Sequence, residues 1–177
     1  MIFRKDKAAD LRARIVPLLP GVWRFALSLS GRPDIADDLT QDTCLRALER
    51  AHQWRENQAL AGWLLIICRS IWLNEVRAQT VRKTGGMTSA KAHDLVDQTV
   101  GPETRLFANQ VFARVMELPE AQRATVMLVY VQQFTYSEAA EILGIPIGTV
   151  MSRLSTARAA LATLNDTQLP GAKAKPR

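Results

Sequence analysis

Residues 135–154 read TYSEAAEILGIPIGTVMSRL, and this stretch predicts two short helices joined by a tight turn. Thr135 and Glu138 form the pattern of a capping box, so a helix is expected to begin there. Gly144 suits the left-handed stop of that helix, and positions 148–149 can begin the second one. Two helices that cross at a short turn form a helix-turn-helix, whose second helix lies in the DNA major groove. Similar helical hairpins also occur in protein-interaction modules.

The second of these helices has two distinct faces. One face is apolar at helical spacing and is expected to face the core; it carries Val150, Leu154, Ala157 and Leu161. The opposite face carries Met151, Ser152, Ser155, Thr156 and Ala159. Its hydroxyls and methionine can touch base edges or phosphates, and Arg153 and Arg158 at the flanks are natural phosphate clamps. We therefore expect this helix to contact duplex DNA.

The rest of the chain predicts an all-α protein with two small helical domains. Almost every apolar segment of the 177 residues repeats at i, i+3 and i+4, and strand-like alternation is nearly absent. The two helical blocks are expected at residues 8–83 and 102–164. Residues 84–101 contain Gly-Gly and Gly-Pro pairs without an apolar stripe, which predicts a flexible linker. The basic tail, residues 165–177, is expected to be disordered.

Charge and hydropathy limit the partners and the location of the protein. The chain has 23 Lys and Arg against 17 Asp and Glu, and the net charge of +6 favours an anionic partner. Its longest nearly unbroken apolar run, residues 59–68, is far shorter than the ~20 residues that cross a bilayer. No signal-peptide core forms near the N-terminus, so we expect a cytoplasmic protein without a membrane span.

The chain offers no arrangement typical of catalysis or metal binding. It has no phosphate-binding loop and no Ser/His/Asp set, and its two histidines, His52 and His93, have no partner ligands at metal spacing. Cys44 and Cys68 lie in apolar helical patterns and are expected to be small buried hydrophobes. We therefore expect no enzyme, no catalytic or metal-binding residues, no cofactor and no small-molecule substrate.

One helix of the first block, residues 34–52, has an acidic face. It follows Gly31, which is expected to end the preceding helix, and Pro33 suits its first turn. Its predicted buried stripe consists of Ala36, Leu39, Thr43, Cys44, Ala47 and Ala51. The other face carries Asp34, Asp37, Asp38, Gln41, Asp42 and Glu49. Leu45 and Leu48 lie among these acids, and an apolar patch rimmed by charge is typical of a protein interface. A solvated face or a second intramolecular packing surface remain the alternatives.

The next helix, residues 59–83, changes character along its length. Its first part is apolar all round and must be buried in a bundle. From Arg69 onward, one side carries Arg69, Ser70, Leu73, Arg77 and Thr80. This side can contact phosphates, and Trp54 in the preceding polar loop can stack on unpaired bases. A core position is the equal alternative for Trp54, whereas Trp63 and Trp72 are expected in the core.

Several motifs, taken in order, resemble bacterial sigma factors of the extracytoplasmic-function (ECF) type over about residues 11–164. DDLTQDT at 37–43 resembles the helix of that family that binds core RNA polymerase. Trp63-Leu64 with Ile67, Arg69 and Asn74 resembles the segment that engages the promoter minus-ten element. LPEAQR at 118–123 is similar to the LPxxxR opening of the second domain, and residues 136–158 match the minus-thirty-five-binding motif.

The resemblance implies a transcription initiation factor that binds core RNA polymerase and promoter DNA, with an anti-sigma factor as a further expected partner. The polymerase-binding residues that it implies are Asp38, Gln41, Asp42, Leu45, Leu48 and Glu49. The candidate minus-ten residues combine Arg69 and Asn74 of the resembling segment with Trp54, Ser70 and Arg77, which come from the polar loop and the basic side described above. The minus-thirty-five residues are Thr149, Met151, Ser152, Arg153, Ser155, Thr156 and Arg158.

Two other functions remain open from the sequence. A helix-turn-helix transcriptional regulator, whose first block senses a ligand or dimerises, would act without docking on core polymerase. A sigma-like decoy would bind an anti-sigma factor and no DNA. The acidic face with Leu45 and Leu48 favours polymerase docking over the first alternative. Arg153 and Arg158 favour DNA binding over the second.

Overall fold

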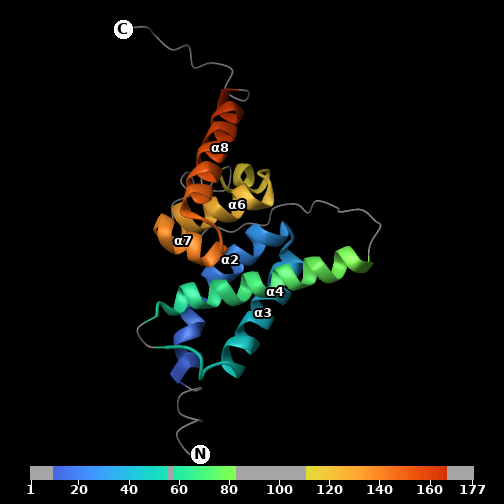
Figure 1. The fold of residues 1–177 in the computed structure, drawn as a ribbon. Helices are drawn as coiled ribbons and strands as arrows, with labels where there is room; N and C mark the ends of the chain where they lie inside the picture. Colours follow the sequence, from blue (N-terminus) through green and yellow to red (C-terminus); the bar gives the residue numbers. More distant parts are fainter. Residues whose placement is uncertain (1–9, 56–57, 83–110, 167–177) are drawn as a thin grey trace, which may run out of the picture.

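The computed structural model describes residues 10–55, 58–82 and 111–166 (Figure 1). Within these ranges no residue lies in a β-strand, which confirms the all-α prediction. The predicted linker at 84–101 and His93 lie outside the described residues. The last helix continues to Asp166, just past the expected boundary at residue 164. The rest of the predicted tail, from residue 167 onward, also lies outside the described residues.

The helices follow one another through both predicted blocks. Residues 10–15 and 111–116 are helical. The other elements are the 3-10 turn η1 (Val16–Leu18), α2 (Leu19–Ser30), α3 (Pro33–Glu49), α4 (Leu60–Arg82), α6 (Glu120–Val126), the π-helical turn η2 (Met127–Val131), α7 (Tyr136–Leu143) and α8 (Ile147–Asp166).

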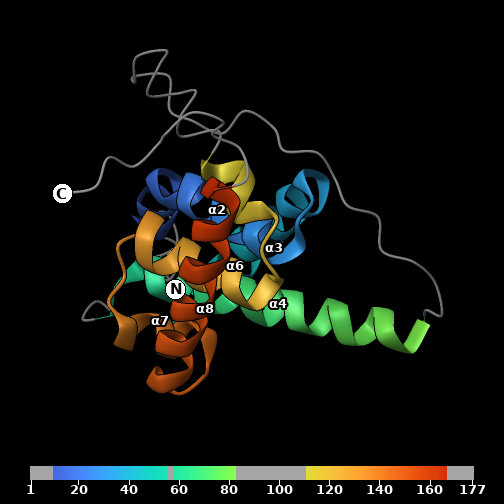
Figure 2. The same ribbon diagram turned by 90° about the horizontal axis from the view of Figure 1, so that it is seen from above.

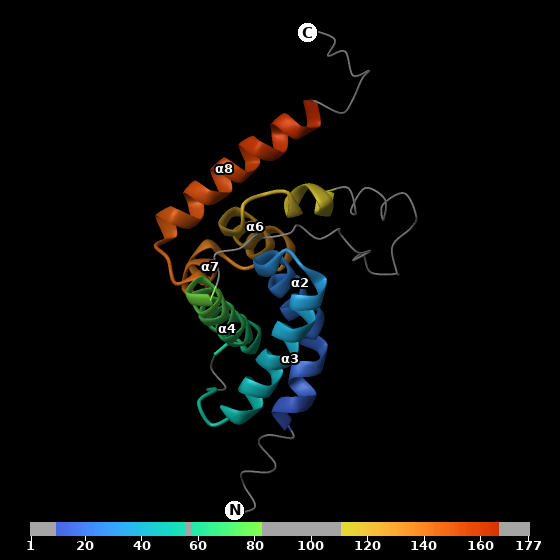
Figure 3. The same ribbon diagram turned by 90° about the vertical axis from the view of Figure 1, so that its right-hand side faces the viewer.

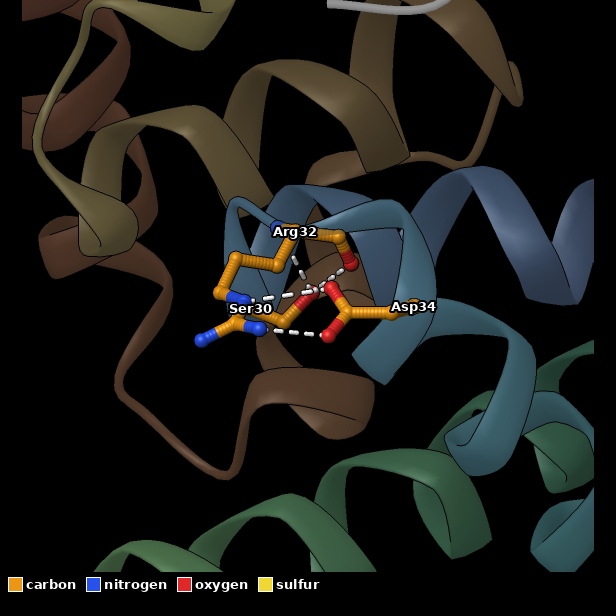
Figure 4. Close-up of polar contacts among 3 residues, drawn as sticks. All are labelled: Ser30, Arg32 and Asp34. Carbon is orange, nitrogen blue, oxygen red and sulfur yellow. Dashed lines mark hydrogen bonds and ion pairs between the residues drawn. The ribbon is translucent and has the colours of Figure 1, made fainter. Parts of the chain in front are cut away.

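The turn between α2 and α3 is fixed by local chemistry. Gly31 ends α2 in the left-handed conformation, with φ of 70°, and Pro33 begins α3, as predicted. The Ser30 hydroxyl accepts a hydrogen bond from the Arg32 backbone N–H, and the Arg32 guanidinium pairs with Asp34 (Figure 4). That pairing lowers the pKa of Asp34, and it places an acid at the positive end of α3.

The core of the first block forms where α2, α3 and α4 pack together. The predicted stripe of α3 is buried, apart from Cys44, which is half-buried. Trp63 and Trp72 are buried, as predicted. Cys68 is also buried, and burial raises the pKa of its thiol to about 12, so it is an inert hydrophobe beside Thr43.

The second block contains the predicted helix-turn-helix. The capping box is present, because the Thr135 hydroxyl accepts from the Glu138 N–H and the Glu138 carboxylate accepts from the Thr135 N–H. Gly144 ends α7 in the left-handed conformation, with φ of 56°. Helix α8 begins at Ile147, slightly earlier than the predicted start, because the Pro146 carbonyl accepts from Thr149 and so serves as the first helical acceptor.

The two blocks pack against each other in this structure. Helix α2 lies against α6, and α4 lies against α7, so one core is shared between the blocks (Figures 1 and 3). Polar contacts that cross between the blocks join Arg123 to the carbonyls of Ser28 and Leu29 at 2.5 and 3.2 Å, Trp72 Nε1 to Glu120 Oε1 at 2.9 Å, and Gln132 Nε2 to the Gly21 carbonyl at 3.1 Å. We call this arrangement the closed form, and the surface between the blocks the seam.

Candidate protein-binding and nucleic-acid interfaces

The acidic face of α3 is uncovered in the closed form. Its candidate residues Asp38, Gln41, Asp42 and Glu49 are exposed. Leu45 is 60% exposed, which is high for a large apolar side chain, whereas Leu48 is half-buried and packs against the core. The structure therefore displays one of the two predicted leucine anchors and uses the other mainly for folding.

Glu75 of α4 joins this face, although sequence reasoning missed it. Partial burial raises the pKa of the Glu75 carboxyl, and the nearby charges of Asp42 and Asp38 raise it further. The acidic face therefore extends from α3 onto the neighbouring helix. A signal was available in the sequence, since Glu75 is the only acid in α4 and so stands out in a helix that is otherwise apolar and basic.

The basic side of α4 meets the helix-turn-helix at the seam. The Arg69 guanidinium is half-buried, and its Nη1 would lie 3.1 Å from a Cβ on Gly144, at the end of α7. Burial lowers the pKa of Arg69, and the charges of Arg153 and Arg77 lower it further. A candidate minus-ten residue and a candidate minus-thirty-five residue thus lie close together in the closed form.

The remaining candidates on α4 are freely accessible. Ser70, Asn74 and Arg77 are exposed. The C-terminal end of α4 projects away from the other helices, as Figure 2 shows. This part of the basic side is therefore open to a ligand even while the blocks are packed together.

Trp54 lies in the core rather than on the surface of its loop. It is 3% exposed, its Nε1 donates to the Gln58 carbonyl at 3.2 Å, and the Arg14 guanidinium lies 4.5 Å from the centre of its ring. The two ring faces are therefore occupied or covered, and the candidate role of Trp54 as a base-stacking platform has no support in this conformation. The core alternative is the one observed.

The outward face of α8 is exposed, as its pattern predicts. Val150, Leu154 and Ala157 are fully buried. Met151, Ser152, Ser155, Thr156 and Arg158 are exposed, while Thr149 and Arg153 are half-buried. Met151 is 47% exposed, and a helix that presents a methionine, hydroxyls and arginines around one face suits a DNA groove.

In comparisons with known proteins, one family model matches the block that carries the acidic face and the basic side, and another matches the block that carries the helix-turn-helix. The family model for Sigma-70 region 2 matches residues 15–82, and the model for Sigma-70, region 4 matches residues 109–161. The ECF RNA polymerase sigma factor EcfG of Rhodopseudomonas palustris is 35% identical over 155 residues, which are 88% of this chain and 84% of EcfG. The chain belongs to the ECF sigma factors.

Other sigma factors support the same assignment. The ECF sigma factor SigC of Mycobacterium tuberculosis is 32% identical over 161 residues, which are 89% of this chain and 84% of SigC. The sigma factor RpoE of Bartonella quintana, solved in complex with the anti-sigma factor NepR, is 29% identical with a TM-score of 0.73, over 90% of this chain and 99% of RpoE. CnrH, solved with the cytosolic domain of CnrY, shares the fold at 22% identity and a TM-score of 0.58, over 95% of this chain and 97% of CnrH.

As an ECF sigma factor, the chain acts in transcription initiation with core RNA polymerase and promoter DNA. An independent helix-turn-helix regulator is not favoured, because region 2 matches the first block. Among the described helices none is both long and apolar enough to span a membrane.

Proposed function

We propose that this sigma factor docks on core RNA polymerase through the acidic face of α3, extended by Glu75. Helix α8 then contacts the minus-thirty-five duplex, and the basic side of α4 captures the melted minus-ten strand. The observation that carries this proposal is that the candidate residues on the α3 face and on the outward face of α8 are mostly exposed. The two helices lie toward opposite ends of the molecule (Figure 3). No chemical step, cofactor or small-molecule substrate is needed, and the site of action is the cytoplasm.

Simultaneous reading of both promoter elements requires the blocks to separate. The centres of the two elements lie about 25 base pairs apart, which is about 85 Å along a duplex. In the closed form, by contrast, Arg153 lies near enough to Arg69 for its charge to lower the pKa of Arg69. The 28 residues at positions 83–110 can span about 90 Å when extended, which is sufficient for the open arrangement.

Linking two DNA-binding blocks also explains how weak individual contacts suffice. Once one block is held on polymerase or DNA, the second binds at a high effective concentration. The unstacking of minus-ten bases has a cost, which binding to the basic side of α4 offsets. The exposed residues Ser70, Asn74 and Arg77 supply that surface, joined by Arg69 when the blocks separate.

We further propose that an anti-sigma factor restrains the chain before induction. The support is that RpoE and CnrH, which share this fold, were solved with the anti-sigma factor NepR and with CnrY. Control by synthesis alone is the alternative. Pull-downs from unstressed source cells that recover polymerase but no inhibitor would contradict restraint by a partner.

Run-off transcription with purified core polymerase and a promoter library tests the proposed function. The expected result is specific initiation that depends on both the chain and the core enzyme. Binding to duplex DNA without core polymerase, and no initiation, would instead indicate an independent regulator. Binding to an anti-sigma factor with neither DNA binding nor initiation would indicate a decoy.

A further inference from the structure

The outward face of α8 lacks the side chains that read purines by paired hydrogen bonds. Its exposed residues near the middle of the helix are Met151, Ser152, Ser155, Thr156 and Ala159. Arginine, lysine, asparagine and glutamine make the bidentate hydrogen bonds that distinguish guanine or adenine, and none of these five residues belongs to those types. Serine hydroxyls bond to more than one base, so they discriminate weakly. Base selection by this face therefore needs a different contact.

The hydroxyl of Thr156 is already engaged within the helix. Its Oγ1 donates to the Ser152 carbonyl, one turn earlier, at 3.1 Å. A hydroxyl has a single donor hydrogen, so Thr156 has no donor left for a base edge. It still offers acceptor lone pairs and a methyl group, and the side chain of Ala159 is a methyl group alone. The face is thus poor in hydrogen-bond donors and rich in apolar groups.

Met151 is the largest apolar side chain on this face. It is 47% exposed, and it lies one turn after Ile147, which begins α8 and is 45% exposed. The N-terminal part of a recognition helix is the part that reaches base edges in the major groove. A large apolar side chain in water gains free energy when a partner covers it, and the flexible thioether of methionine adapts to the shape of that partner. An apolar group on the DNA is therefore the best match for Met151.

The major groove presents one apolar substituent, the C5-methyl group of thymine. The edges of the other bases are distinguished by hydrogen-bond donors and acceptors. Arg153 and Arg158, at the flanks of the face, suit phosphates, whose contacts add affinity and fix the register without reading sequence. The flanks of α8 therefore suit the DNA backbone, and the apolar contact is left to select bases.

We propose that Met151 is a specificity-determining residue that recognises the C5-methyl group of a thymine in the minus-thirty-five element. This inference rests on the proposed function, in which α8 contacts that duplex. It adds the base that is selected and the chemical group by which the base is selected. The preferred element carries this thymine, on one strand or the other, opposite the first turns of α8.

Changes to single groups of the DNA test the inference directly. The promoter library of the run-off assay supplies a preferred minus-thirty-five duplex, in which each thymine is replaced singly by 2′-deoxyuridine. Uracil pairs with adenine as thymine does and lacks only the C5-methyl group. Each duplex competes for the holoenzyme, which is the chain bound to core polymerase. Because one buried methyl group is involved, we expect uracil to weaken binding about three- to fivefold at one position or more. Equal affinity at every position would overturn the proposal.

Variants of Met151 assign the effect to this side chain. Met151→Ala should bind the thymine and uracil duplexes equally at the sensitive position, whereas Met151→Leu keeps a large apolar group and should retain the preference. Both variants should keep the thermal stability of the wild type, because Met151 is exposed. Val131→Ala removes an apolar side chain of similar exposure, 46%, from η2 and is the matched control, with the preference of the wild type. An undiminished thymine preference in Met151→Ala would overturn the assignment.

The transcription assay separates this inference from the function on which it rests. If the wild type initiates but its binding is insensitive to the C5-methyl group at every position, the inference about Met151 alone fails. If the wild type neither initiates with core polymerase nor binds the minus-thirty-five duplex, the proposed function itself fails.

Discussion

Replacing Arg123 by methionine should shift the closed form toward separated blocks. The Arg123 guanidinium donates through Nε and Nη2 to the carbonyls of Ser28 and Leu29, at the end of α2, and through Nη1 to the Met116 and Leu118 carbonyls of its own block. The last carbonyls of a helix lack intrahelical partners and carry partial negative charge, so a cation there is favourable. Arg123→Met keeps the stem but removes both hydrogen bonds across the seam.

The expected size of the effect follows from those two bonds. A hydrogen bond that involves a charged group contributes about 1.5–3 kcal/mol. Arg123 is only half-buried, and water hydrates both partners after opening, so each of the two bonds is taken below this range, at about 1–1.5 kcal/mol. A loss of about 2–3 kcal/mol reduces the closing equilibrium constant by about 30- to 150-fold.

Gln132→Ala provides a graded control within the same seam. It removes one neutral hydrogen bond, from Gln132 Nε2 to the Gly21 carbonyl, which is worth about 1 kcal/mol. Among the described residues the Gln132 side chain makes no hydrogen bond to its own block, whereas Arg123 does, so this variant also separates seam effects from effects on the fold of the second block. The expected closing constant lies between those of the wild type and Arg123→Met.

Small-angle X-ray scattering and binding to a forked minus-ten probe measure the shift. The radius of gyration should increase in the order wild type, Gln132→Ala, Arg123→Met. Probe affinity should increase in the same order, because only the fraction with an accessible Arg69 binds fully. An Arg123→Met variant with native helical content, but with unchanged radius and probe affinity, would refute the claim that these bonds hold the blocks together.

Other perturbations address the individual surfaces. Leu45→Ala should weaken core polymerase binding by about 1–2 kcal/mol in titrations without loss of stability. Leu48→Ala should mainly lower the free energy of unfolding, and the reverse pattern would contradict the assignment of the exposed anchor. In fluorescence anisotropy, Arg158→Ala should weaken binding to the minus-thirty-five duplex and lower the salt dependence of that binding by about one unit of slope. Arg77→Ala should have the same two effects only on forked minus-ten probes. Equal losses on both probes would indicate diffuse charge alone. Because the folded state raises the pKa of Glu75, its charged form is disfavoured at neutral pH, so the contribution of Glu75 to the free energy of unfolding should rise as the pH falls through that pKa. Glu75→Gln should abolish this rise in urea titrations and be at least as stable at pH 7.

Local structure was predictable because its determinants lie within a few residues of each other. The capping box at Thr135 and Glu138 needs only a spacing of three, and the stops at Gly31 and Gly144 need only a residue that tolerates the left-handed conformation. The buried stripe of α8 follows from helical periodicity. The capping box and the two stops were predicted at the correct residues, whereas in the predicted stripe of α8 Val150, Leu154 and Ala157 are buried and Leu161 is only half-buried.

Side-chain exposure was less predictable wherever a second element decides it. A helical wheel places Leu48 on the outer face of α3, but the structure packs it partly against the core. Trp54 lies in a polar stretch, yet the guanidinium of Arg14, from a helix distant in sequence, covers its ring. Glu75 lies close to the acids of α3 only because α3 and α4 are neighbours in space. None of these relations has a fixed spacing in the sequence.

The packing of the two blocks was the least predictable feature, and the nature of the seam explains why. Three of its polar contacts, two from Arg123 and one from Gln132, end on backbone carbonyls, which every residue possesses, so no complementary side chain marks the partner position. Arg123 is the arginine of the LPEAQR motif, but the motif alone does not reveal which groups this arginine contacts.

The same contacts set the energy scale on which this protein can be regulated. The two seam bonds of Arg123, at about 2–3 kcal/mol, change the ratio of closed to open molecules by about 30- to 150-fold, since each 1.4 kcal/mol is a factor of ten. A partner present at a hundred times its dissociation constant adds about 2.7 kcal/mol to the form that it binds. The hydrogen bonds of the seam and one bound inhibitor therefore contribute comparable free energies to the closed form. The binding free energy of polymerase and promoter DNA must exceed the sum of these contributions for the blocks to separate. Removing the inhibitor then lowers the free energy that opposes opening by about 2.7 kcal/mol, which changes the open fraction about a hundredfold without any change in the sigma factor itself.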